Sequence, residues 1–170
     1  MISDGENLGV IPINRIEPYY KIALKVAQES PCQRRKYGAV IGYADSISLV
    51  SACNARVTKC CDGNICVRER YGLSNGERTE LGAEVHAEQA VLIDAPKRGD
   101  IFVLAGWKIG PTAQTILLGA DSYPCLVCAR MIKYAGYKWV YIKNEKEILE
   151  PIHIETIIEY REMEASPYYD

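Results

Sequence analysis

The chain lacks any hydrophobic run long enough to cross a membrane, which takes about 20 consecutive apolar residues. It also lacks the basic stretch followed by an apolar segment that marks a secretory signal. Hydrophobic residues still make up 48% of the 170 residues, enough for a sizeable core. We therefore expect one cytoplasmic domain over residues 1–170, with its core at about 18–163 and flexible termini.

Positive charge is also scarce. The sequence has 20 Lys and Arg against 22 Asp and Glu, a net charge of −2, and its one dense basic run is Arg34-Arg35-Lys36. A protein that grips a long polyanion usually presents a larger basic surface. Neither a nucleic acid nor a membrane is therefore an expected partner.

The cysteines do not suit a disulfide framework, because their number, seven, is odd and no secretory signal is evident. Metal binding or buried free thiols fit this count better. The cysteines stand at positions 32, 53, 60, 61, 66, 125 and 128.

Helical and strand patterns alternate along the chain, which predicts a layered α/β domain. We expect helices at residues 18–29, 84–95, 125–135, about 145–150 and 153–163. Short apolar runs predict strands at 37–43, 47–52, 101–105 and 139–142, the first two paired as a hairpin. Residues 54–82 form a long polar segment, which indicates a functional loop with one helical turn near 67–71. Residues 106–123 fit either a loop or an extra hairpin.

Two short motifs carry the chemistry of the chain. His86-Ala87-Glu88 falls at the start of one expected helix, and Pro124-Cys125-Leu126-Val127-Cys128 leads into another. A helix points side chains three positions apart the same way, so the two cysteines can act together. One imidazole and two thiolates make three zinc ligands and leave a fourth position for water, which is typical of catalytic zinc.

Glu88 suits a proton shuttle better than a fourth ligand, because it lies on the same helical turn as His86. Zinc lowers the pKa of bound water toward ~7. A carboxylate can take that proton and return it to a ring nitrogen and then to departing ammonia. The alternatives are a structural zinc half-site, a redox pair at Cys125 and Cys128, and a structural His86. A structural site has no need of the Glu88 carboxylate.

The pattern His-x-Glu followed by Pro-Cys-x-x-Cys is the signature of zinc-dependent nucleobase deaminases. Beyond it, the chain resembles the deoxycytidylate (dCMP) deaminase family, within the cytidine deaminase-like superfamily. The similar segments are SPCQRRKYGAV (30–40), CVRERYGLSNGERTEL (66–81) with VHAEQ (85–89), and CARMIKYAG (128–136). The resemblance covers roughly residues 20–142 and implies a three-layer α/β/α fold with a mixed five-stranded sheet.

The resemblance implies zinc-dependent hydrolysis of dCMP to dUMP and ammonia. It places Zn²⁺ on His86, Cys125 and Cys128, with Glu88 as the catalytic acid and base. The same zinc and carboxylate would serve another amidine substrate, namely a 5-substituted dCMP, cytidine, dCTP or guanine. A zinc-stabilised domain that has lost activity is the non-enzymatic alternative.

Substrate contacts follow from the same resemblance. It implies that Asn54 and Ala87 line the substrate site. Arg34 and Arg35 are our candidates for the 5′-phosphate, because guanidinium forks match phosphate oxygens. A solvated surface is the alternative for this pair of arginines.

Some relatives hold a second, structural zinc with cysteines from the opening segment and the long loop. Cys32, Cys61 and Cys66 stand at comparable places here, and Cys60 competes with Cys61 for the role. Buried thiols are the alternative. The family further implies a homo-oligomer and suggests a nucleotide effector as a partner.

Overall fold

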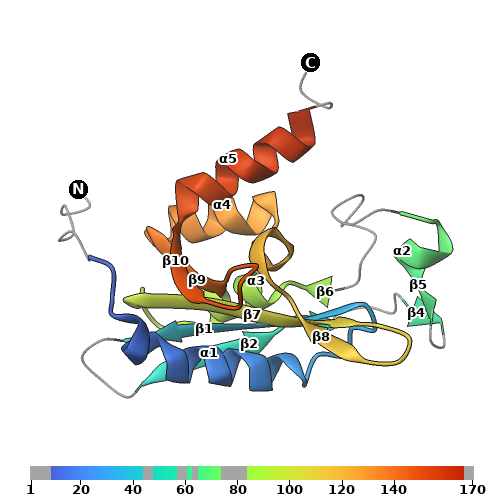
Figure 1. Ribbon diagram of the computed structural model, residues 1–170, viewed down its shortest axis with the longest axis horizontal. Coiled ribbons are helices and arrows are strands. Elements are labelled where there is room, and N and C mark those ends of the chain that lie inside the picture. The colour runs from blue at the N-terminus through green and yellow to red at the C-terminus, as the bar shows by residue number, and fades with distance from the viewer. Residues whose placement is uncertain (1–8, 44–47, 57–60, 63–64, 74–83, 167–170) are drawn as a thin grey trace.

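The computed structural model describes residues 9–43, 48–56, 61–62, 65–73 and 84–166. At its centre lies a mixed sheet of six strands (Figure 1). The strands are β1 (Arg35–Gly42), β2 (Leu49–Cys53), β7 (Ile101–Ile109), β8 (Gln114–Ile116), β9 (Trp139–Lys143) and β10 (Leu149–His153). Their order is β10-β9-β7-β1-β2, with β8 paired to β7, and the pairing of β7 with β9 is parallel.

Helices cover both faces of this sheet (Figure 1). Helix α1 (Ile13–Ala27) lies on one face, and α3 (Ala87–Asp94), α4 (Leu126–Tyr134) and α5 (Ile154–Ala165) lie on the other. The predicted three-layer α/β/α fold is therefore confirmed. The sheet has six strands rather than the expected five because β8 pairs with the last residues of β7, from Trp107 to Ile109.

Alternate residues of the central strand β7 face opposite layers of the fold. Phe102 and Leu104 pack toward α3, α4 and α5, whereas Ile101, Val103 and Ala105 pack toward α1. All of them are at most 1% exposed. Burial on both faces explains why this strand reads as a continuous apolar run in the sequence.

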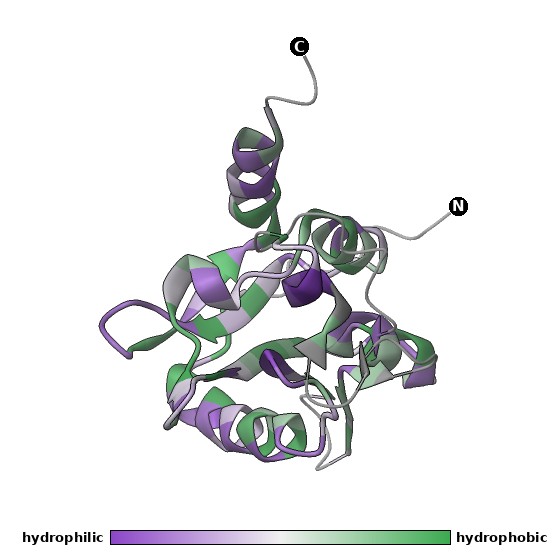
Figure 2. Cartoon of the chain, turned by 90° about the vertical axis from the view of Figure 1, so that its right-hand side faces the viewer, coloured by the Kyte–Doolittle hydropathy of each residue, from purple (hydrophilic) through white to green (hydrophobic). Residues whose placement is uncertain are grey.

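Helix α1 begins at Ile13, earlier than the predicted 18–29, and continues through Pro18. Proline removes one backbone hydrogen bond from a helix. The full burial of Ile16 against the sheet offsets that loss. Both hydrophobic and hydrophilic residues appear on α1 below the sheet in Figure 2, as expected for a helix with one buried face.

The prediction of a helix at 145–150 is wrong, because a turn joins β9 to β10 there. Oδ1 of Asn144 accepts hydrogen bonds from the backbone N–H of Lys146 at 2.9 Å and of Ile148 at 3.0 Å. Glu147 adopts a left-handed backbone with φ of 61°. An asparagine side chain that binds nearby backbone groups competes with helix formation. The other expected helices are present with shifted ends.

The two long connections contain short elements. Residues 106–123 include the hairpin of β7 and β8, followed by the 3₁₀ turn η2 (Gly119–Ser122). In the expected loop 54–82, β3 (Ala55–Arg56) pairs with β6 (Glu84–Val85), and β4 (Cys61–Asp62) pairs with β5 (Ile65–Cys66). The predicted helical turn is α2 (Val67–Arg70).

Some predictions fall outside the described residues. They concern residues 57–60, 63–64 and 74–83 of the long loop, and the termini at 1–8 and 167–170, for which we expected flexibility. Among the helices that the structure describes, none is long and apolar enough to cross a membrane.

Candidate metal centre

His86 lies at the junction of two elements, after β6 and at the residue that caps the N-terminus of α3. Its backbone N–H donates to Oε1 of Gln89 at 3.0 Å, as in a capping box. The extended backbone of His86 lets Val85 pair with β3 before the helix begins. The imidazole is therefore fixed by a strand end and a helix start, and lies just before the helix rather than inside it.

The two cysteines of the second motif converge on this imidazole. Cys125 caps the N-terminus of α4 and Cys128 lies in its first turn. Their Sγ atoms lie 3.5 and 3.4 Å from Nδ1 of His86. Tetrahedral zinc, with Zn–S near 2.3 Å and Zn–N near 2.0–2.1 Å, separates such ligand atoms by about 3.6 Å. The three residues therefore fit a zinc ion, with Nδ1 as the nitrogen ligand.

His86, Cys125 and Cys128 bring their ligand atoms within 4.8 Å of one another. In the part of the chain that the structure describes, no other three His, Cys, Asp or Glu residues do so. Three protein ligands leave a tetrahedral ion one position for water or substrate. The geometry thus has the form of a catalytic site rather than a closed structural one.

The three side chains shift one another's pKa. Hydrogen bonding with Cys128 lowers the pKa of the Cys125 thiol to about 4, and the same contact raises the pKa of Cys128. The hydrogen bond with Cys125 raises the pKa of His86 to about 9, although burial opposes this rise. These shifts favour a thiolate at Cys125 and an imidazolium at His86. A bound metal ion would displace the protons of His86 and Cys128.

Glu88 is buried in the first turn of α3, with 4% of its surface exposed. Burial raises the pKa of its carboxyl group to about 7, and the positive charges of His86 and Arg161 oppose that rise. A group with a pKa close to the working pH is suited to both accepting and donating a proton. The sequence placed this carboxylate near the metal ligands, and the structure adds that it is removed from solvent.

Asn54 follows β2 directly, as predicted, and is buried. Its Oδ1 accepts a hydrogen bond from the backbone N–H of Tyr37 at 2.8 Å, and its Nδ2 donates to the carbonyl of Arg35 at 3.1 Å. The side-chain amide therefore ties the end of β2 to β1. Ala87 is fully buried between His86 and Glu88 in the chain.

Arg34 and Arg35 point to different segments. Nε of Arg34 lies 3.3 Å from Oε1 of Glu69 on α2, and Nη2 of Arg35 lies 3.3 Å from Oδ1 of Asp121 on η2. Nη1 of Arg35 also donates to the hydroxyl of Tyr37 at 3.4 Å. Each guanidinium is thus paired with a carboxylate, and a phosphate would have to compete with that pairing.

The cysteines considered for a second metal are only partly described. Cys32 and Cys66 are buried, and the backbone of Cys61 pairs with that of Cys66. Cys60 and the side chain of Cys61 lie outside the described residues. Burial raises the pKa of Cys32 to about 12, and Glu84 adds to the rise. A metal ion would have to replace a proton that this environment retains.

Sequence reasoning missed two residues beside the centre. Tyr37 of β1 donates its hydroxyl proton to the carbonyl of Asp121 at 3.1 Å. Arg161 of α5 donates to the carbonyl of Pro124, directly before Cys125, at 3.0 Å. Neither residue belongs to a local motif, and the packing of β1 and α5 brings them to the site. No signal in a single sequence marks them.

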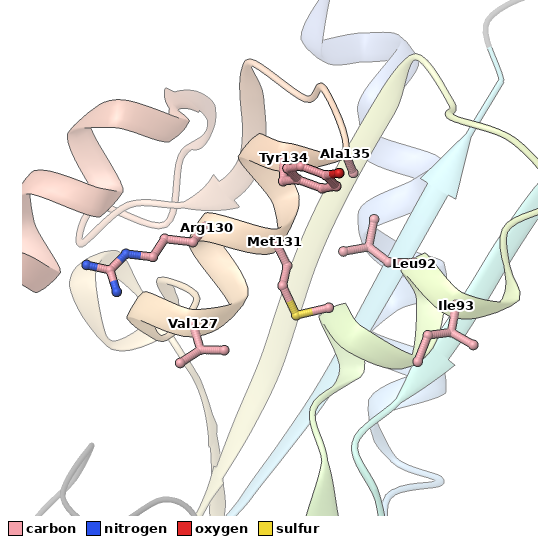
Figure 3. A pocket seen from close by; sticks show the side chains of 7 residues that line it. All are labelled: Leu92, Ile93, Val127, Arg130, Met131, Tyr134 and Ala135. Atoms are coloured by element: carbon pink, nitrogen blue, oxygen red, sulfur yellow. The ribbon is translucent and has the colours of Figure 1, made fainter.

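An apolar groove lies between α3 and α4 (Figure 3), and none of the three candidate metal ligands lines it. Its volume is about 620 Å³. Leu92 and Ile93 of α3 line one side, and Met131 points toward them from α4. Tyr134, at the rim, is 96% exposed, and Ile93 is 73% exposed.

Three convergent ligands with an open fourth position, beside a buried carboxylate, are the parts of a zinc hydrolase. The family "Cytidine and deoxycytidylate deaminase zinc-binding region" matches residues 13–144, so the chain belongs to this family. The family and the cluster of His86, Cys125 and Cys128 together support Zn²⁺ as the cofactor. The resemblance noted in the sequence is confirmed for the cytidine deaminase-like superfamily.

Solved structures of similar fold include two cytidine deaminases. That of Burkholderia pseudomallei is 16% identical, with a TM-score of 0.49, over 86% of this chain and 96% of that chain. That of Mycobacterium tuberculosis is 18% identical, with a TM-score of 0.47, over 87% of this chain and 94% of that chain. A search of curated protein sequences finds no match.

Proposed function

We propose that this protein is a dCMP deaminase, which hydrolyses dCMP to dUMP and ammonia. The observation that carries the proposal is the buried carboxylate of Glu88, on the helical turn that follows the metal ligand His86. A structural metal site gains nothing from a buried acidic group, which costs free energy through desolvation. A hydrolytic site needs such a group to move protons.

A zinc ion held by His86, Cys125 and Cys128 would supply one element of the chemistry, a water molecule acidic enough to become a nucleophile near neutral pH. Glu88 accepts the proton of that water as oxygen adds to C4 of the cytosine ring. It would return that proton to ring nitrogen N3. It would then take the second proton of the water from the hydroxyl group now on C4 and pass it to the amino group, which leaves as ammonia when the C4–N bond breaks. The product has a carbonyl at C4, and the reaction consumes one water molecule.

Recognition of the nucleotide is a separate part of the proposal. We assign the 5′-phosphate to Arg34 and Arg35, and the sugar or base to Asn54 and Ala87. Glu69 and Asp121 compete for the two guanidiniums. Both ion pairs are partly exposed on the carboxylate side, at 52% and 62%, where such pairs contribute little stability. A dianionic phosphate can therefore displace them.

The experiment is ammonia release from purified protein loaded with zinc. dCMP is set beside dCTP, cytidine, deoxycytidine, CMP, 5-methyl-dCMP and guanine, with Glu88→Ala as the control. We expect selective turnover of dCMP and a loss of at least 10²–10⁴-fold in the control, with zinc retained. If only another compound of the panel, for example cytidine, is turned over, that compound is the substrate and the assignment of dCMP is wrong. Equal turnover by Glu88→Ala would overturn the role of that residue.

A second candidate is a zinc-stabilised domain without activity. It predicts that zinc-loaded protein leaves every substrate of the panel unchanged, and that Glu88→Ala increases stability by removing a buried carboxylate. Our proposal predicts instead that Glu88→Ala loses turnover. Comparison of the wild type with Glu88→Ala therefore separates a deaminase from an inactive domain.

We also propose that the protein is a homo-oligomer whose copies meet at the groove of Figure 3. Tyr134 lines this groove and is nearly fully exposed. In our proposal, the groove of one copy receives Tyr134 of the other copy. A two-fold axis makes such a contact self-complementary, and tyrosine is enriched where interface energy concentrates. The Arg130 charge at the groove is neutralised by Glu162 at 3.0 Å, so it does not oppose the association.

Light scattering after size-exclusion chromatography tests this interface. We expect a mass above the 19.0 kDa of one chain, and a shift toward that mass in Ile93→Ser/Tyr134→Ser. Tyr71→Ser, at a tyrosine that is 68% exposed away from the groove, is the control. An unchanged mass in the double variant would place the interface elsewhere.

The remaining proposals need separate measurements. One is a second, structural zinc on Cys32, Cys61 and Cys66, which predicts two zinc ions per chain rather than one. Others are a nucleotide effector, a cytoplasmic location and a single domain over residues 1–170. Addition of dCTP or dTTP to the dCMP assay would reveal an effector.

A further inference from the structure

Arg161 reaches from α5 into the segment that precedes the first zinc cysteine. Its Nε donates to the carbonyl of Pro124 at 3.0 Å. Its Nη2 donates to the carbonyls of Tyr123 at 2.8 Å and of Ala120 at 3.2 Å. One guanidinium thus satisfies three backbone acceptors within five consecutive residues. The side chain is only 21% exposed, so these hydrogen bonds are largely shielded from water.

The segment held by Arg161 lacks a sheet ladder or α-helix to fix it. It contains the 3₁₀ turn η2, the extended residue Tyr123 and then Pro124, and it ends at Cys125. From β1, Arg35 and Tyr37 bind Asp121 in the same turn. The backbone leading into Cys125 is therefore held from two sides, by β1 and by α5.

We propose that Arg161 is a positioning residue for the metal centre, which fixes the Pro124 backbone so that the Cys125 thiolate meets Nδ1 of His86. The inference rests on the proposed metal ligands. A small displacement of the Pro124 carbonyl would move Cys125, because the two residues share a peptide bond. His86 comes from a different element, β6 and α3, and does not move with it.

The charge of Arg161 serves the same centre. Two thiolates and the Glu88 carboxylate bring three negative charges against the two positive charges of Zn²⁺. The guanidinium of Arg161 supplies a further positive charge beside these groups. Arg161 is itself held in place by Glu164, whose Oε2 lies 2.7 Å from its Nη1.

A merely structural arginine on α5 would act by holding α5 to α4. The structure offers a matched control for that role, because Arg130 of α4 pairs with Glu162 of α5 at 3.0 Å on the exposed surface. Arg130→Ala removes an ion pair between the same two helices and leaves in place the hydrogen bonds of Arg161 to residues 120–124.

The test uses the full chain loaded with Co²⁺ and, separately, with Zn²⁺. Cobalt reports ligand geometry through its visible bands, including thiolate-to-cobalt charge transfer, and a chromogenic chelator reports the rate of zinc release. Arg161→Ala is expected to release zinc about 10-fold faster or more, because loss of a residue that supports a metal ligand typically weakens metal binding by about 10–100-fold. It should also shift the cobalt bands. Arg130→Ala should leave both unchanged.

Arg161→Lys separates position from charge and guards against a variant that fails to fold. Lysine keeps the positive charge but cannot span the three carbonyls with a planar fork. We expect zinc release between the wild type and Arg161→Ala, with a shifted cobalt spectrum. A wild-type spectrum and release rate in Arg161→Lys would overturn the proposal. Absence of a thiolate–cobalt band in the unmodified protein would overturn the ligand assignment itself.

Discussion

Nδ1 of His86 lies 3.4 Å from Sγ of Cys128, although the two residues are 42 positions apart in the chain. They reach one another because α3 and α4 lie on the same face of the sheet and both begin at its same end, with His86 and Cys125 as their N-caps. A zinc ion is the natural occupant of this arrangement.

Cys128→Ser should abolish stoichiometric zinc binding and remove the stabilisation that bound zinc supplies. A bound ion at 100 times its dissociation constant stabilises a fold by about 2.7 kcal/mol. A chelator should accordingly lower the Tm of the wild type and leave that of the variant nearly unchanged. Cys53→Ser, at a cysteine outside the cluster, is the control. One zinc per chain retained in Cys128→Ser would show that the ligand assignment is wrong.

Gly38→Ala should destabilise the fold by about 1–3 kcal/mol, since overpacking displaces backbone. A Cβ at Gly38 would clash with the carbonyl oxygen of Ala23 and lie 2.9 Å from the backbone nitrogen of Ala27. Both atoms belong to α1, which therefore cannot keep its distance from β1. Gly9→Ala is the control, because nothing lies within 4 Å of its added Cβ. Urea unfolding measures both, and equal stability of the two variants would contradict the prediction.

Asn54→Ala should lower the free energy of unfolding by about 1–3 kcal/mol, because the backbone N–H of Tyr37 would lose its acceptor. Asn54→Asp keeps that acceptor but turns a carboxylate toward the carbonyl of Arg35, which now receives a hydrogen bond. We expect it to be destabilised as well. Urea unfolding at pH 7 measures both effects. Wild-type stability in both variants would mean that this hydrogen-bond pair contributes nothing.

Stability should fall above pH 10 through Tyr20. Burial, with the charge of Glu147 adding to it, raises the pKa of this phenol from 10 to about 12. Its hydroxyl has no hydrogen-bond partner in the described structure, and Nζ of Lys143 lies 5.0 Å from the centre of its ring. Because the folded pKa is the higher one, the neutral phenol stabilises the fold fully below pH 10, and that contribution is lost as pH rises through 12.

The full effect is about 2–3 kcal/mol, because the pKa rises from 10 to about 12 and each pKa unit corresponds to 1.36 kcal/mol. About half of it has developed at pH 11. Tyr20→Phe has no proton to lose there, so its stability should decline less between pH 10 and 12. Tyr71→Phe, at an exposed tyrosine, is the control and should follow the wild type. Unfolding by urea at pH 8, 10 and 11 gives the comparison. Parallel curves for the wild type and Tyr20→Phe would contradict the assignment.

Local patterns predicted most elements, but their ends depended on contacts between distant segments. The apolar run at 101–105 became β7, and the strand continues to Ile109 because Arg35–Gly42 of β1 pairs along its length. The segment 145–150 reads as helical in isolation. It became a turn and a strand because Asn144 caps the turn and β9 offers hydrogen bonds to β10.

The sequence by itself determined the α/β class and the metal chemistry. The residue types and spacings of His86, Glu88, Cys125 and Cys128 show which groups can bind zinc and which can move a proton. Only the tertiary structure decided that these groups meet, that Glu88 is buried, and that Arg161 holds the segment before Cys125. Ligand identity is a property of single residues and short spacings. Burial and distance arise from packing between elements that are far apart in the chain.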